Sequence, residues 1–304
     1  MLRKILIALF LLLSVRAYSQ ETDSLVDLSK ITFNVDKADF KTLLDSSYYY
    51  SNTNPKLAIF FGLKALDKMS DNTDIYHKGK LLVTLGRSYH DLGDYSKAID
   101  YYFDELKLYH GNNGEYDKYI ISTSINIGEA YRAAVDLHSA LLHLNKAINL
   151  INKSGIKNNL PFALDRLASV YFEIGITNHD TTAILKSISY ADSSLKLSRL
   201  EQDTGTMCSC LNIIGACYAY LGNFKTAIQK YSEAESYYPR DEINRSNLLN
   251  NIANAYYLLD DMDNAIKYAT HRYNLAKPQG IIVYLKEATH HLSQAHKQKG
   301  NSQL

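Results

Sequence analysis

The chain has 304 residues, of which 46% are hydrophobic, so it is long enough and apolar enough to bury a core, and this argues against general disorder. Its 33 lysines and arginines are interleaved with 32 aspartates and glutamates, without the basic stripe that a nucleic-acid-binding protein normally carries. The 25 tyrosines beside 9 phenylalanines and no tryptophan favour half-buried aromatic sites over a single dry core.

The first residues have the pattern of an export signal. A positive start at residues 3–4 precedes the apolar run 5–15, and the sequence 17–19 fits a small-x-small cleavage site. The run is shorter than the roughly 20 apolar residues of a membrane helix, and no later stretch approaches that length. We therefore expect cleavage between Ser19 and Gln20 and a periplasmic or secreted mature chain with no membrane span.

A motif of small and aromatic residues recurs after residue 39. In its clearest copy, Gly86 is followed by Tyr89, Ala98 and Tyr102, and the same spacing starts again at Gly128 and Gly215. Two antiparallel helices approach closely only where side chains are small, so Gly86 and Ala98 are expected at a helix crossing, with the tyrosines around it. Three weaker copies complete the series: Ser46, Tyr49 and Ala58; Ala168, Tyr171 and Ser187; Ala253, Tyr256 and Ala265.

This motif resembles the tetratricopeptide repeat. The resemblance implies an all-α fold, a right-handed superhelical solenoid of helix-turn-helix repeats over residues 39–300, with six hairpins and the first helix of a seventh. The longest step between repeats is expected to hold a polar surface loop near residues 175–182. Residues 20–38 lack the motif and are expected to form an irregular leader or a short extra helix, and 301–304 a tail.

Signs of catalytic or metal chemistry are weak. The sequence has no HExxH motif, phosphate-binding glycine loop or nucleophile elbow. Adjacent His290 and His291 diverge by about 100° on a helix and are interpreted as surface or groove residues. Cys210 and Cys217 would lie roughly 10 Å apart on one helix, so these two and Cys208 are interpreted as buried free thiols. We expect no enzyme activity, cofactor or metal, although a small-molecule site near His179 is a minor alternative.

A stripe of asparagines is the best candidate for a binding surface. Asn247, Asn250 and Asn254 lie three and four residues apart and so share one helix face. Asparagine is a poor helix former, and its paired donor and acceptor groups match the main chain of an extended peptide. The alternative is that these side chains bond to the neighbouring repeat or to water.

In tetratricopeptide proteins the first helices line a concave groove, and the resemblance implies the same here. The repeat register predicts further groove residues: Lys80, Arg87, His90, Glu129, Arg132, Asp165, Ser169 and Asn212. Asn126, Arg166 and Asn251 are predicted at the margin of the groove. This face mixes both charge signs with amides, so a basic clamp for a terminal carboxylate is not expected. The sequence thus predicts a non-enzymatic scaffold for a peptide or a partner helix. The alternative is the periplasmic sensory region of a truncated histidine kinase or transcription regulator.

Overall fold

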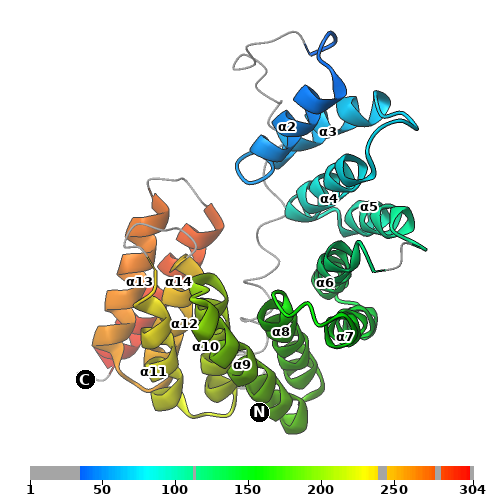
Figure 1. The fold of residues 1–304 in the computed structure, drawn as a ribbon. Helices are drawn as coiled ribbons and strands as arrows, with labels where there is room; N and C mark the ends of the chain where they lie inside the picture. The colour runs from blue at the N-terminus through cyan, green and yellow to red at the C-terminus, as the bar shows by residue number, and fades with distance from the viewer. Residues whose placement is uncertain (1–34, 112–113, 239–244, 278–281, 302–304) are drawn as a thin grey trace. The chain divides into compact units, whose positions relative to one another are not determined.

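The computed structural model describes residues 35–111, 114–238, 245–277 and 282–301; the expected export signal and most of the leader lie outside them. The regular structure of these residues consists of 13 α-helices and no strand, which confirms the all-α prediction. The helices form two compact units, one ending at Asn159 and the other beginning at Leu160 (Figure 1). None of the described helices combines the length and apolar composition that crossing a membrane requires.

Each unit is built of helical hairpins that follow one another along the chain (Figure 1). In the first unit the pairs are α2 (Phe40–Tyr50) with α3 (Pro55–Asp67), α4 (Ile75–Asp91) with α5 (Tyr95–Leu108), and α6 (Asp117–Ala133) with α7 (Leu137–Ser154). In the second unit they are α8 (Leu160–Asn178) with α9 (Thr181–Glu201), α10 (Thr204–Tyr220) with α11 (Phe224–Glu235), and α12 (Arg245–Leu258) with α13 (Met262–Ala276). A last helix, α14 (Ile282–Asn301), packs on α13 and α12.

Most helices start at a side-chain cap, which explains the short turns. An aspartate or asparagine before the helix accepts a hydrogen bond from a backbone N–H two or three residues further on, and so satisfies a donor that the helix leaves unpaired. The capping residues are Asp39, Asn54, Asp74, Asp94, Asp136, Asp180, Asp203, Asn223 and Asp261. The first residue of each capped helix is therefore specified locally by the sequence.

The helix crossings contain the small residues of the motif. A Cβ atom added to Gly86 would lie 2.4 Å from a ring carbon of Tyr102, and one added to Gly215 would lie 2.5 Å from the ring of Tyr231. Such distances are far inside van der Waals contact, so only glycine allows these helices to pack as they do. The other expected tyrosine, Tyr89, stacks on Tyr101 with ring centroids 5.5 Å apart. The close crossing that the motif predicted is confirmed.

The first repeat is shifted by one residue from its predicted register. The buried serine is Ser47, whose hydroxyl donates to the carbonyl of Ala58 at 2.8 Å. Tyr50 stacks on Phe61, while Tyr49 is 73% exposed. The prediction of Ser46 and Tyr49 was wrong because consecutive serines and tyrosines fit the motif in either register, and only packing against α3 separates them.

The predicted loop near residues 175–182 is also wrong. Helix α8 continues to Asn178 and α9 begins at Thr181, so the additional residues lengthen both helices. His179 turns the chain in the left-handed region at φ 55°, and Asp180 caps α9. Gly175, which was expected in the loop, lies in α8 where an added Cβ would be 2.5 Å from Ile184. The site is a close helix crossing, so a small-molecule pocket in a loop around His179 is not formed.

The first helices of successive hairpins form one layer in each unit. Helix α4 contacts α2 and α6 in the first unit, and in the second unit α10 contacts α8 and α12, while α12 also contacts α14. The extensive contacts between helices that do not follow one another in the chain are all made by these first helices. The predicted groove residues all belong to the helices of this layer.

Candidate functional site

The polar surface of the second unit is centred on a pair of amides. Asn251 of α12 donates from Nδ2 to Oδ1 of Asn212 on α10 at 2.9 Å. Asn247 and Asn254 lie one helical turn before and after Asn251, and all four side chains are partly exposed. We call these four residues, Asn212, Asn247, Asn251 and Asn254, the amide face. Each amide has two donor hydrogens and an acceptor oxygen, so the pair leaves further hydrogen-bonding groups for a ligand.

Asn247 is the member of the amide face whose side-chain oxygen lacks a hydrogen-bond donor in the described part of the chain. Its Oδ1 has less than 1 Å² of accessible surface and no hydrogen-bond partner among the described residues. A buried acceptor without a partner costs about 1–3 kcal/mol. Because the oxygen is covered by the protein's own atoms, a ligand can meet Asn247 only at the rest of its partly exposed side chain.

Asn250, which was predicted to face the groove, is instead buried. It is 4% exposed, and its Oδ1 accepts a hydrogen bond at 2.6 Å from the guanidinium of Arg272 on α13. Arg272 is 1% exposed and also donates to Ser246 at 3.1 Å and pairs with Glu287 of α14. The groove position predicted for Asn250 is therefore wrong, because this edge of the stripe faces α13. Asn251, predicted at the margin, lies at the centre of the amide face.

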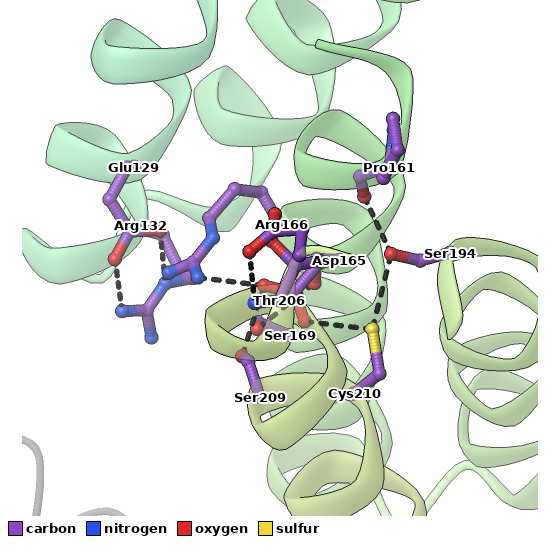
Figure 2. Close-up of polar contacts among 11 residues, drawn as sticks. Glu129, Arg132, Pro161, Asp165, Arg166, Ser169, Ser194, Thr206, Ser209 and Cys210 are labelled. Atoms are coloured by element: carbon purple, nitrogen blue, oxygen red, sulfur yellow. Dashed lines mark hydrogen bonds and ion pairs between the residues drawn. The ribbon is translucent and has the colours of Figure 1, made fainter. Parts of the chain in front are cut away.

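Asp165 is the second predicted groove residue that the structure buries. Its carboxylate is fully buried and pairs with Arg166 at 2.7 Å (Figure 2). It also accepts from the hydroxyl of Ser209 at 3.1 Å and lies 3.4 Å from Sγ of Cys210. Burial raises the pKa of the Cys210 thiol, which therefore stays protonated. Asp165 joins α8 to α10 and is not available to a ligand.

The partners of Asp165 extend this buried network to α9. Sγ of Cys210 lies 3.1 Å from Oγ of Ser194, which donates to the carbonyl of Pro161 at 2.6 Å (Figure 2). All three cysteines are free and buried, as predicted. Ser169 is partly exposed and donates to the backbone carbonyl of Asp165 at 3.2 Å. The network therefore stabilises the first hairpin of the second unit.

In the first unit, the predicted groove residues of α4 contact α2 or their own hairpin. Lys80 lies 3.7 Å from Asp45 and 4.3 Å from the ring centroid of Tyr48. Arg87 is exposed and donates to Asn52 at 3.2 Å. His90 is partly exposed, with Nδ1 3.6 Å from the carboxylate of Asp91 and its ring against Tyr95.

The predicted residues of α6 are paired with each other. Arg132 donates to Glu129 through two hydrogen bonds of 2.9 and 2.6 Å, the bidentate arrangement that a guanidinium and a carboxylate favour. Asn126, one turn before Glu129, is partly exposed. The charges on this helix thus largely compensate each other, whereas the amide face of the second unit retains unused hydrogen-bonding groups.

Comparison with known proteins agrees with the repeat geometry. Models of the tetratricopeptide repeat match residues 81–116, which cover the later part of α4 and all of α5, and residues 246–271 in α12 and α13. These two stretches of the chain are tetratricopeptide repeats. No curated protein sequence matches it.

Solved structures of tetratricopeptide type share its fold at low sequence identity. The apo form of the quorum sensor NprR from B. thuringiensis aligns with a TM-score of 0.63 and 15% identity, over 94% of this chain and 79% of that one. NprR in complex with its cognate peptide NprX aligns with a TM-score of 0.58 and 16% identity, over 87% and 77%. The APC/C hetero-tetramer Cut9-Hcn1 aligns with a TM-score of 0.61 and 16% identity over 86% of this chain, which spans only 44% of that chain's length.

Two charged residues occupy a repeat position that elsewhere holds a small side chain. In each second helix, the residue seven after the small crossing residue is buried. It is Ala65, Ala147, Ser194 or Ala234 in four of the hairpins, but Glu105 in α5 and Arg272 in α13. Glu105 is 2% exposed and accepts from Thr123 of α6 at 2.7 Å, and burial raises its pKa to about 7. The spacing from Ala98 to Glu105 and from Ala265 to Arg272 could have revealed both residues in the sequence.

Proposed function

We propose that this chain is a non-enzymatic scaffold whose amide face binds an extended peptide segment of a partner protein. The observation that carries the proposal is the amide pair of Asn212 and Asn251, with partly exposed Asn247 and Asn254 one helical turn before and after Asn251. An extended peptide presents alternating N–H and C=O groups, and asparagine amides can meet both. The structure of NprR with its cognate peptide NprX supports the proposal by showing that a protein with this fold binds a peptide.

The polarity of the site also suggests which part of a peptide it accepts. The amide face carries no charge, so it suits an internal main-chain segment better than a terminal carboxylate. Any charged side chains of the ligand would have to point away from the four asparagines, because burying an unpaired charge against neutral amides is unfavourable.

The test is selection of binding peptides from a random peptide library on the purified chain, followed by fluorescence anisotropy. Asn247→Ala together with Asn254→Ala should weaken binding by roughly tenfold or more, equivalent to the loss of one or two hydrogen bonds. Asn274→Ala, on the exposed surface of α13, is the matched control and should leave affinity unchanged. Equal affinity for the double variant and the unmodified chain would refute the amide face as the binding site.

We infer that the chain is exported and cleaved between Ser19 and Gln20. Amino-terminal sequencing of protein recovered from its native host should give Gln20 as the first residue. Retention of residues 1–19 in all of the recovered protein would contradict export by this route.

A further inference from the structure

Helix α14 packs on α13 in the way that the first helix of a hairpin packs on the preceding hairpin. On such a helix, two residues seven apart contact the preceding second helix, as Cys210 and Cys217 of α10 contact α9. The corresponding residues of α14, Ala288 and Ala295, are buried, and Ala295 packs on α13. His291 lies between them on the same face and is 6% exposed, so its interpretation as a surface or groove residue was wrong. Helix α14 therefore has the position of a first helix.

A second face of these first helices is covered by the second helix of the same hairpin. In α4 this face consists of Gly79, Leu82 and Gly86, all of which are buried. A Cβ atom added to Gly86 would lie 2.4 Å from the ring of Tyr102 on α5, so the covering helix is in direct contact. The same three positions are buried in α6, α10 and α12.

On α14 this second face is open. Its residues are Lys286, Thr289 and Ser293, spaced as in α4, and all three are exposed. They line an open pocket together with Tyr273 of α13 and with Leu285 and His290 of α14. Tyr273 and Leu285 are partly buried and give the pocket an apolar side. The place that a second helix takes in the hairpins is thus accessible on α14 in the described part of the chain.

The open face carries positive charge at both ends. Lys286 and Lys297 are exposed, lie about three helical turns apart on one side of α14, and have no ionic partner among the described residues. Glu287, the acidic residue of α14, pairs with Arg272 instead. The exposed residues between the two lysines are Thr289, His290, Ser293 and His296. None of these is acidic, so a partner that brings carboxylates would match the charge of this face.

We propose that the open face of α14 binds an acidic amphipathic helix of a partner protein, which lies where a second helix lies in the hairpins. The apolar side of this helix packs on Tyr273 and Leu285, and its carboxylates pair with Lys286 and Lys297. The site is separate from the amide face and does not rest on the proposed function.

Ser293 limits the size of the side chain that the partner helix can place at the crossing. At Gly86 and Gly215 a tyrosine ring comes so close that an added Cβ would lie 2.4 and 2.5 Å from it. Ser293 already has a Cβ, so the partner helix has to present a small residue such as alanine at this point.

Selection from a library of helical peptides of roughly 20 residues tests the proposal. Alanine or leucine is fixed at the apolar positions, the outward positions are varied, and peptides selected on the purified chain are measured by fluorescence anisotropy. The selected peptides should be rich in aspartate and glutamate. Lys286→Glu with Lys297→Glu should weaken their binding by about tenfold or more at low salt. Ser293→Tyr should abolish binding, because the new ring fills the place of the partner helix.

The matched control is Lys225→Glu with Lys267→Glu, at exposed positions of α11 and α13. It makes the same change in net charge and should leave the affinity within about threefold. Circular dichroism checks that each variant keeps its helices. Asn247→Ala with Asn254→Ala should not affect the helical peptides, so this site and the amide face can fail separately.

Three results would overturn the proposal. One is equal affinity of the acidic peptides for the unmodified chain and for either α14 variant. Another is a selection that yields no acidic helix, since the face would then only be solvated. The third is a homodimer in analytical ultracentrifugation that Ser293→Tyr dissociates, because the occupant would then be a second copy of the chain.

Discussion

Glu105→Gln should remove the pH dependence that one buried carboxyl gives to the stability of the first unit. Glu105 is 2% exposed, and its neighbours, Tyr109 just after α5 and Thr123 of α6, offer hydroxyl groups and no positive charge. Burial therefore dominates and raises its pKa from 4.5 to about 7. Because the folded pKa lies above the unfolded one, the protonated form stabilises the fold. This contribution is complete below about pH 4.5 and is lost as the pH rises through about 7.

The size of the effect follows from the difference between the two pKa values. A shift from 4.5 to about 7 corresponds to about 3 kcal/mol, at 1.36 kcal/mol for each pH unit. Glutamine has nearly the same shape and remains neutral. Glu105→Gln should therefore match the unmodified chain at about pH 4 and exceed its free energy of unfolding by about 3 kcal/mol at about pH 8.

Urea unfolding followed by circular dichroism across this pH range measures the difference in unfolding free energy between the two chains. The contributions of the other titrating groups cancel in this difference. Asp104→Asn removes the same charge from the adjacent exposed position and should change the unfolding free energy by less than about 0.5 kcal/mol at any pH. A constant difference between Glu105→Gln and the unmodified chain at all pH values would refute the reasoning, since it would mean that the carboxyl does not titrate in the folded state.

Three further substitutions test the packing. Gly79→Ala should destabilise the chain by about 1–3 kcal/mol, because the new Cβ would lie 1.8 Å from the Tyr109 hydroxyl. Adding Tyr109→Phe should restore part of the lost stability. The control Gly300→Ala, in open space, should not destabilise the chain. Asp165→Ala should lower the unfolding free energy by about 2–3 kcal/mol without changing peptide affinity, and reduced affinity in the folded variant would contradict its structural role. Arg272→Met should cost about 3–5 kcal/mol in urea unfolding, because Glu287 loses its partner; a cost below about 1 kcal/mol would show that the ion pair is dispensable.

The hairpins could be predicted from the sequence, because the features that define them are local. Gly86 followed by Tyr89 and Ala98 already indicates a close helix crossing, since no other residue type fits there. Aspartate and asparagine caps mark helix starts in the same local way, as Asp94 does for α5. The buried state of the cysteines was predictable for a similar reason, since Cys210 and Cys217 continue the apolar stripe of α10.

Which polar side chains remain available to a ligand depends on the packing between helices, and the sequence could not predict it. Asn250 and Asn251 are adjacent on α12, and from the helical period alone either of them could lie near the stripe that contains Asn247 and Asn254. Packing separates them, because one meets Arg272 of α13 and the other meets Asn212 of α10. The contacts of Glu105 were hidden for the same reason: its hydrogen-bond partner Thr123 lies on another helix. The helical period predicts in which direction a side chain points from its own helix. What that side chain meets there depends on the neighbouring helices, whose positions are known only from the folded structure.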